Sequence, residues 1–401
     1  MRHVYFIGEN LGLLRNLEAI FLVDSWNIIY ITSQKPIKNK SENYLHIETS
    51  KDKRFIEELL RKSELLESIN GLVIFGSDHE MREVSISNCP IWIKKKLLPT
   101  KNEIGFSILD SKVGLARILM ELNIKSPRQY IFDSMIDIEM LEISKELPWL
   151  MKGDSGGGGS KVLDINNIDL EVPSQKNIGF PFVLQEKILG EEIYVEAFYW
   201  EGILTGYIYN KDVRNISTYG PSYSRSVADP GNLDFRNSLV TLGKNLEISG
   251  LVNCTFILES NSNEHYLVEF DPRPNVWHHL AKYLEFDLPQ LFEIGKYNVV
   301  QTPARFAQVF SLDRYINFLE RNLEIKNILR LLRIIFSNSI YVLEFPNDSI
   351  LYKFKFVAIK FARISCFNLM KNLFRKMPRS FQDLIKRRGY TLSLSQFILR
   401  N

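Results

Sequence analysis

Four consecutive glycines, Gly156 to Gly159, interrupt the chain between two short apolar segments, LPWLMK and SKVLDI. Apolar segments of this length are typical of strands, so the glycines are expected at the tip of a β-hairpin. Such a tip can bring backbone N–H groups close to a polyphosphate, and Lys152 can reach the phosphates as a point charge. A flexible linker is the alternative, disfavoured by the strands on both sides. The run is not a P-loop, because neither GKS nor GKT follows it.

The first hundred residues alternate between strand and helix patterns. HVYFIG and NIIYIT have strand character, LLRNLEAIFLVDS between them is helical, and one charged helix, DKRFIEELLRKSELLE, precedes a further strand, GLVIFGSD. This alternation predicts a parallel sheet with helices on its faces, a small doubly wound domain over residues 1–103. The glycines of GENLG do not form a GxGxxG pattern, so a dinucleotide site is not expected.

The composition limits the setting in which the protein works. Hydrophobic residues make up 45% and charged residues 24% of the chain, as in soluble globular proteins, and no apolar run is long enough to cross a bilayer. The N-terminus lacks the pattern of a signal peptide. The three cysteines, Cys89, Cys254 and Cys366, fit neither a CxxC metal site nor a disulfide framework. A cytoplasmic location is therefore expected.

Two acidic motifs follow the glycine run. In QEKILGEE, carboxylates at the end of an apolar strand could accept hydrogen bonds from an adenine amino group and ribose hydroxyls, although a solvated turn explains the same residues. In EFDPR, Glu269 and Asp271 are two residues apart, so a strand presents both on one face, where they suit Mg²⁺. Arg273 could bind a carboxylate or phosphate through two hydrogen bonds. An exposed strand end is the alternative for EFDPR, weakened by the flanking apolar YLV.

The glycine hairpin, QEKILGEE and EFDPR, in this order, resemble the ATP-grasp superfamily of carboxylate–amine or carboxylate–thiol ligases. The resemblance covers roughly residues 1–300 and implies a mixed α/β and α+β fold. Residues 1–103 would be the domain that precedes the grasp, 104–182 the small lid subdomain with its connecting helix, and 183–300 the large subdomain. Residues 301–401 would form a mainly helical, basic C-terminal region.

The resemblance also implies ATP and Mg²⁺ as cofactors and assigns a role to each matching residue. Lys112 and Lys152 would bind the phosphates, with Glu192 on the ribose. Glu269 and Asp271 would be the metal ligands, and Arg273 would contact the acyl phosphate. The implied nucleotide-binding set is Lys112, Lys152, Gly156, Gly157, Gly158, Gly159, Glu186, Lys187, Leu189 and Glu192, of which Glu186, Lys187 and Leu189 would face adenine.

One position departs from the family pattern. The family has a further acid on the strand before EFDPR, but this chain reads GLVNCTFILES, which places Thr255 there. Asp271 stands where the family usually has Asn, so the number of negative charges is kept while their position changes. Catalytic competence is therefore less secure than ATP binding.

Some polar residues carry weaker signals. Lys211 and Arg214 could reach the phosphates or the acceptor substrate, as basic residues here do in the family, and a solvated hairpin is an equal alternative. His278 and His279 are adjacent and lack the spacing of a zinc site, so they are expected to be structural.

The C-terminal region differs in charge from the rest of the chain. Residues 301–401 contain 18 Lys and Arg but 6 Asp and Glu. A helical pattern there places Lys353, Lys360, Arg363, Lys371 and Arg375 on one stripe, which fits an anionic membrane surface or an acidic carrier. A helix packed on the acidic body with its lysines in water is the alternative. Nucleic acid is not expected, because no recognition motif is present.

The sequence thus predicts an ATP-dependent ligase that joins a small-molecule carboxylate to an amine through an acyl phosphate. Three alternatives stay open: a nucleotide-binding scaffold without turnover, a ligase at the inner membrane surface that acts on lipid- or polysaccharide-linked substrates, and, for assembly, a homodimer.

Overall fold

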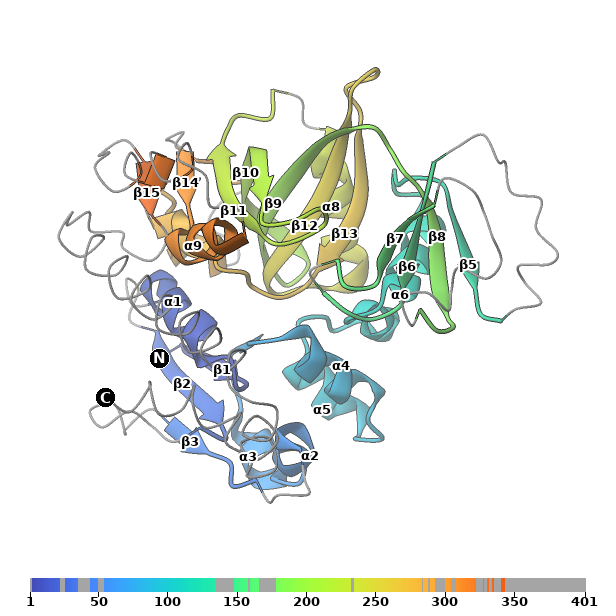
Figure 1. Cartoon of the computed structure of the whole chain (residues 1–401). Helices are drawn as coiled ribbons and strands as arrows, with labels where there is room; N and C mark the ends of the chain where they lie inside the picture. Colours follow the sequence, from blue (N-terminus) through green and yellow to red (C-terminus); the bar gives the residue numbers. More distant parts are fainter. Residues whose placement is uncertain are drawn as a thin grey trace, which may run out of the picture.

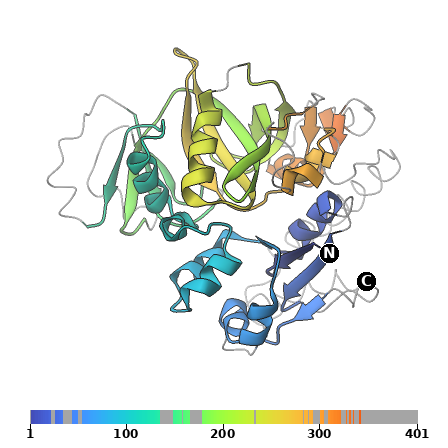
Figure 2. The ribbon, with the colours of Figure 1, turned by 180° about the vertical axis from the view of Figure 1, so that it is seen from behind.

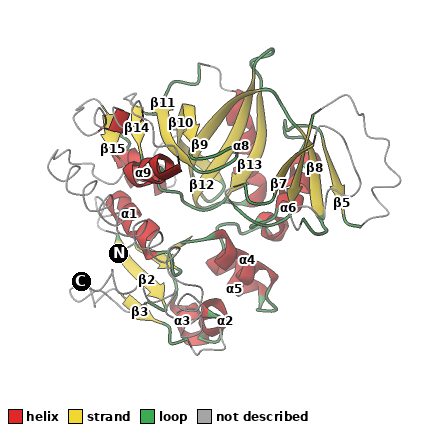
Figure 3. Cartoon of the chain, viewed as in Figure 1, coloured by secondary structure: helices red, strands yellow, loops and turns green. Residues whose placement is uncertain are grey.

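The computed structural model of the chain describes residues up to Val342, in several stretches. The described residues are 2–21, 26–34, 44–49, 54–134, 148–157, 159–165, 178–231, 234–282, 284–287, 289–292, 300–303, 308–321, 327, 330–331, 334 and 340–342. Within them the strands form three sheets, which Figure 1 and Figure 3 show with the helices that cover them.

A parallel sheet with strand order β3-β2-β1-β4 forms the N-terminal domain. Its strands are β1 (His3–Ile7), β2 (Asn27–Thr32), β3 (Tyr44–His46) and β4 (Leu72–Phe75). Its helices are α1 (Leu11–Phe21), α2 (Phe55–Leu60), α3 (Ser63–Ser68), α4 (Asp78–Ile86) and α5 (Ile91–Leu97). Both faces of the sheet are covered, because Val4 and Phe6 share a core with α1 whereas Tyr5 and Ile7 share another with Leu59 of α2. The prediction of a doubly wound domain is confirmed.

The single helix predicted over DKRFIEELLRKSELLE is two helices in the structure, α2 and α3. The backbone N–H groups of Arg61 and Lys62 bond to the carbonyls of Glu58 and Leu59, three residues back, which tightens and ends α2. The chain then restarts at α3 in a direction that lets Leu66 enter the same core as Leu59.

The glycine hairpin belongs to a small antiparallel sheet with strand order β5-β8-β6-β7. Its strands are β5 (Gln129–Phe132), β6 (Trp149–Gly153), β7 (Val162–Ile165) and β8 (Phe182–Glu186), preceded by η3 (Glu103–Ile108) and α6 (Lys112–Glu121). Because β6 and β7 pair directly, with Lys152 opposite Val162, the glycines stand at a hairpin tip as predicted.

A larger, mostly antiparallel sheet with strand order β13-β12-β9-β10-β11-β14-β15 forms the centre of the molecule. Its strands are β9 (Gly190–Trp200), β10 (Ile203–Asn215), β11 (Ser222–Val227), β12 (Gly250–Glu259), β13 (His265–Asp271), β14 (Gln308–Phe310) and β15 (Ile340–Val342). The other elements of this part are α8 (Asp234–Leu246), η5 (His278–Lys282), η6 (Pro289–Phe292) and α9 (Leu312–Arg321). The segments WEGI and ESNSNEH form the β9–β10 and β12–β13 connections.

The start of the C-terminal region contains strands as well as the helix that its pattern predicts. Besides α9, it contributes β14 and β15, and β14 pairs with β11 to extend the central sheet. The basic stripe from Lys353 to Arg375 lies outside the described residues. Among the residues that are described, no helix has the length and apolar character needed to span a membrane.

The N-terminal domain packs under the other two sheets, as Figure 2 shows from behind. Thr100, which follows α5, forms a β-bridge with Ile248, and its hydroxyl donates to the carbonyl of Leu246 at the end of α8. This junction brings the first turn of α4 close to the strand β13 and to the glycine hairpin.

Candidate active site

A cavity of about 420 Å³ lies where the small sheet, the large sheet and the first residue of α4 meet. Most of the residues that the sequence assigned to one site line this cavity together. They are Lys112, Lys152, Gly156, Gly157, Gly159, Glu186, Lys187, Glu192, Glu269, Asp271 and Arg273. Gly158 lies outside the described residues.

Lys152 is fixed at the floor of the cavity by the small sheet. It is on β6, and its Nζ donates to Oε1 of Gln185 on the paired strand β8, at 2.6 Å. The pKa of Lys152 is lowered to about 8, mainly by burial; the charge of Glu269 opposes this shift and that of Lys112 contributes to it. An anion that enters the cavity would therefore stabilise the charged form of Lys152.

Lys112 ties the start of α6 to the glycine loop. Its backbone N–H donates to the carbonyl of Asp154 at 2.9 Å, and its Nζ donates to the carbonyl of Gly156 at 2.7 Å. Position 159 requires glycine. Its φ is +72°, and the Cβ of any other residue would lie 2.7 Å from Tyr219. The loop therefore lies close over the cavity, with two lysines below it.

Asp154, at the start of the loop, is bound by groups from two domains. Its carboxylate accepts from Ser111 Oγ at 2.6 Å and from the backbone N–H of Val113 at 3.1 Å. It also forms an ion pair with Arg82 of α4, at 2.9 Å. Burial alone would raise the pKa of Asp154, but these hydrogen bonds outweigh it and lower the pKa. Asp154 thereby attaches the loop to the N-terminal domain.

The QEKILGEE segment connects β8 to β9 along one wall of the cavity. Ile188 lines the cavity, whereas the side chain of Leu189 is 67% exposed and does not. Lys187 forms an ion pair with Asp164 of β7, which raises the pKa of Lys187. Glu192 accepts from Asn215 Nδ2 at 2.7 Å. The segment thus presents Ile188, rather than Leu189, to the cavity beside two carboxylates.

The carboxylates of Glu269 and Asp271 both face the cavity from β13. Burial raises the pKa of Asp271 well above its usual value, and the neighbouring charges of Glu269 and Asp78 raise it further. Thr255 on β12 is paired with Glu269 across the two strands, and its Oγ1 donates to Glu269 Oε2 at 3.2 Å. A hydroxyl thus stands where a third carboxylate would complete the acidic cluster.

The donor set fits Mg²⁺ that arrives with a nucleotide. Within the described part of the chain, no group of three His, Cys, Asp or Glu side chains is placed to hold a metal ion alone. Mg²⁺ commonly takes one or two carboxylates and completes its shell with water and phosphate oxygens. Glu269 and Asp271 would hold the ion, and it would neutralise charge on the phosphates.

Arg273 forms ion pairs with two carboxylates. Its guanidinium forms an ion pair with Asp78 of α4 through Nε and a longer one with Asp271 through Nη2, at 3.4 Å. Although burial opposes it, these two carboxylates raise the pKa of Arg273 above its ordinary value. Sequence reasoning missed Asp78, because its role depends on a contact between domains.

A second buried arginine lies deeper in the same cavity. Arg225 on β11 is 3% exposed and forms an ion pair with Glu196 of β9. Its guanidinium carbon lies 4.0 Å from the ring centre of Tyr194 and 4.5 Å from that of Trp277. Asn275 donates to Glu196 Oε1 at 3.2 Å. These residues form one polar wall of the cavity, and no local sequence motif predicts it.

Two predicted catalytic residues are not on the cavity. Lys211 and Arg214, near the end of β10, are exposed and absent from the cavity lining. The pairing of β10 with β11 shifts register between these two residues, so the strand's alternation is broken there. His278 and His279 are buried, and burial lowers the pKa of His278 to about 3, in keeping with a structural position.

Comparison with known proteins places this architecture among solved structures. No protein-family model matches the sequence, and no curated protein sequence matches it. The structure is similar to N5-carboxyaminoimidazole synthetase from Staphylococcus aureus (13% identity, 80% of this chain and 85% of that chain, TM-score 0.54). It is also similar to an L-amino acid ligase from Bacillus licheniformis (13%, 77% and 79%, 0.54) and to phosphoribosylamine–glycine ligase from Thermotoga maritima (14%, 76% and 79%, 0.54). The protein therefore has the ATP-grasp fold, preceded by a doubly wound α/β domain.

Proposed function

We propose that this protein is an ATP- and Mg²⁺-dependent ligase that joins a carboxylate to an amine and releases ADP and phosphate. The observation that carries the proposal is the meeting of Lys112, Lys152, Glu269, Asp271 and Arg273 in one cavity. Cations below a glycine loop suit phosphates, and paired carboxylates beside them suit Mg²⁺. The names of the similar structures support the reaction class, since they are a synthetase and two ligases. A structure of the S. aureus synthetase contains ADP.

In the proposed first step, an oxygen of the substrate carboxylate attacks the γ-phosphorus of ATP and ADP leaves. Negative charge moves toward the β-phosphate, where the ammonium groups of Lys112, bonded to the carbonyl of Gly156, and of Lys152 would stabilise it. The protein needs no nucleophile of its own, so its contribution is positioning and charge stabilisation.

In the second step the amine attacks the carbonyl carbon of the acyl phosphate. Phosphate leaves, the C–N bond remains, and the nitrogen loses a proton. Arg273 would stabilise the carbonyl oxygen and the leaving phosphate, and its ion pairs with Asp78 and Asp271 support this role because they fix its position.

Release of ADP in the presence of paired carboxylic acids and amino acids tests this function directly. We expect MgATP to raise the unfolding temperature of the wild type, and Lys152→Ala to lose this shift. Lys244→Ala, an exposed lysine on α8, is the matched control and should keep it. Equal shifts in both variants, or no shift in the wild type, would contradict the proposal.

A nucleotide-binding protein without turnover is a second candidate, favoured by one observation. Thr255 is 5% exposed and bonded to Glu269, so a neutral group occupies the position of the missing acid. This function predicts MgATP binding that depends on Lys152 but no ADP release with any acid and amine pair.

A further inference from the structure

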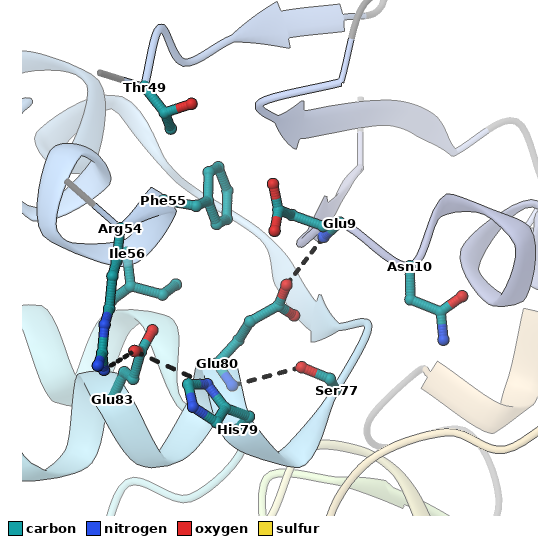
Figure 4. A pocket seen from close by; sticks show the side chains of 10 residues that line it. All are labelled: Glu9, Asn10, Thr49, Arg54, Phe55, Ile56, Ser77, His79, Glu80 and Glu83. Atoms are coloured by element: carbon teal, nitrogen blue, oxygen red, sulfur yellow. Dashed lines mark hydrogen bonds and ion pairs between the residues drawn. The ribbon is translucent and has the colours of Figure 1, made fainter. Parts of the chain in front are cut away.

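A second cavity, of about 580 Å³, lies in the N-terminal domain (Figure 4) and shares no lining residue with the candidate active site. It is at the carboxyl ends of β1 and β4, adjacent strands whose connections leave on opposite sides of the sheet. Such a switch point in a doubly wound sheet is a common position for a ligand. Its lining combines the carboxylates of Glu9 and Glu80 with the apolar side chains of Phe55 and Ile56.

Glu80 of α4 is the unusual residue of this cavity. It is 8% exposed, and its Oε1 accepts from the backbone N–H of Glu9 at 2.8 Å. Its Oε2 is buried and has no hydrogen-bond partner. A buried carboxylate oxygen without a donor costs free energy, so a ligand that supplied the donor would bind favourably.

The chain makes room for this carboxylate. At Gly8, φ is +136° and a Cβ would lie 2.3 Å from Glu80 Oε2. A residue with a side chain at this position would therefore displace Glu80. Figure 4 shows the Glu80 side chain rising from α4 toward the backbone of Glu9, between Phe55 and Asn10. The absence of a side chain at Gly8 thus allows the carboxylate of Glu80 to lie at the end of β1.

The cationic side chains of the lining do not neutralise Glu80. Arg54 forms an ion pair with Glu83 at 2.8 Å, on another part of the rim. The His79 side chain is 70% exposed and lies 3.7 Å from the same Glu83. Among the residues that the structure describes, no ion pair reaches Glu80. Burial raises the pKa of Glu80. Hydrogen bonds from the Glu9 N–H and from Ser77 oppose this rise, and the charge of Glu9 adds to it, so an arriving cation would stabilise the carboxylate.

We propose that this cavity binds a small organic cation, with a primary ammonium or guanidinium group between Glu9 and Glu80. A turn about the soft terminal torsion of Glu80 presents an oxygen to the ligand. Phe55 and Ile56 cover its apolar part. A metal ion suits the cavity less well, since no group of three ligating side chains gathers in the described residues. The site is distinct from the proposed ligase centre, and its occupancy does not depend on ATP.

Calorimetric titration without nucleotide tests the proposal, with butylamine and butylguanidine as the probes and butanol as their uncharged analogue. We expect both cations, but not butanol, to bind the wild type. Glu80→Gln keeps an acceptor for the Glu9 N–H but removes the charge, and should weaken binding by about tenfold or more. Glu9→Gln, at an exposed side chain, should weaken it as well.

Two readouts separate loss of the site from loss of structure. Glu64→Gln removes an exposed acid from α3 and should bind the cations as the wild type does. Glu80→Gln should unfold at a temperature equal to or above that of the ligand-free wild type, because an unpartnered buried charge is gone. Failure of both cations to bind the wild type, or equal binding by all variants, would overturn the proposal.

Discussion

Arg273, two residues after the end of β13, forms an ion pair with Asp78, the first residue of α4 in the N-terminal domain. The contact joins the domain that precedes the grasp to the residue proposed to stabilise the acyl phosphate. It means that the N-terminal domain contributes directly to the geometry of the candidate active site, besides any role in binding a substrate.

Asp78→Asn should therefore impair turnover more than ATP binding. With one of its two carboxylate partners neutral, Arg273 is held less firmly, and a displacement of about 1 Å can cost roughly a hundredfold in rate. We expect kcat for ADP release to fall by about tenfold to a hundredfold while the dissociation constant of MgATP changes by less than about threefold. Asp133→Asn, at an exposed ion pair with Arg117, is the control. An unchanged kcat would show that Asp271 alone positions Arg273.

Lys152 should make ATP binding depend on pH where an ordinary lysine would not. Because its pKa is lowered to about 8, the free protein loses this proton as the pH rises above that value. ATP favours the charged form, so its affinity should fall above pH 8, by at most about tenfold per pH unit. Calorimetry near pH 8 in buffers of different ionisation enthalpy should detect proton uptake on binding. Lys152→Arg stays charged and should show no uptake.

The lowered pKa of Lys152 affects the stability of the free protein in the direction opposite to its effect on ATP affinity. Between a pH of about 8 and the ordinary lysine pKa of 10.5, the unfolded chain keeps a proton that the folded protein has lost. The contribution of Lys152 to the free energy of unfolding should therefore increase with pH in this window. Denaturant unfolding of the wild type and of Lys152→Met across the window measures it, and parallel pH profiles would contradict the shift.

Thr255→Glu should strengthen the metal site. A carboxylate there would repel Glu269, whose Oε2 lies 3.2 Å from the threonine hydroxyl, and lower stability without metal by about 1–3 kcal/mol. With Mg²⁺ and a non-hydrolysable ATP analogue, the three carboxylates should share the ion, and the thermal shift caused by Mg²⁺ should exceed that of the wild type. Thr255→Val keeps the shape without the charge and serves as the control. Equal Mg²⁺ effects in all three proteins would show that position 255 does not contact the ion.

Arg82→Ala should loosen the glycine hairpin. Arg82 binds Asp154 across the domain boundary, and the hydrogen bonds from Ser111 and Val113 would remain. We expect faster amide exchange in residues 153–157 and a higher KM for ATP, with little change in overall stability. Arg117→Ala removes an exposed ion pair of the same subdomain and should leave this exchange unchanged. If both variants exchange alike, the pair with Arg82 does not hold the loop.

The sequence predicts the parts of the site that are local. The glycine hairpin with Lys152 and the alternation that puts Glu269 and Asp271 on one face each need only a few neighbouring residues. The sequence could not show that Ile188, rather than Leu189, lines the cavity, because the chain between β8 and β9 is irregular. It also could not show that Lys211 and Arg214 lie off the cavity, where the pairing of β10 with β11 shifts register.

The missed residues depend on contacts between distant parts of the chain. Asp78 and Arg82 come from α4 and Arg225 from β11, and their roles appear only when the domains are assembled. Thr255 was found because it departs from a family pattern. The roles of the nucleotide and metal residues stay predictions that the variants above can test.

Helix α4 has a consequence for how this sequence can change. Asp78 and Arg82 are one turn apart, so they share the side that faces β13 and the glycine loop, while Glu80 lies on the opposite side, in the second cavity. Inserting or deleting one residue before this helix's first turn would rotate all three side chains by about 100°. Three contacts in three parts of the molecule would fail together, whereas a single substitution in this short helix removes one of them.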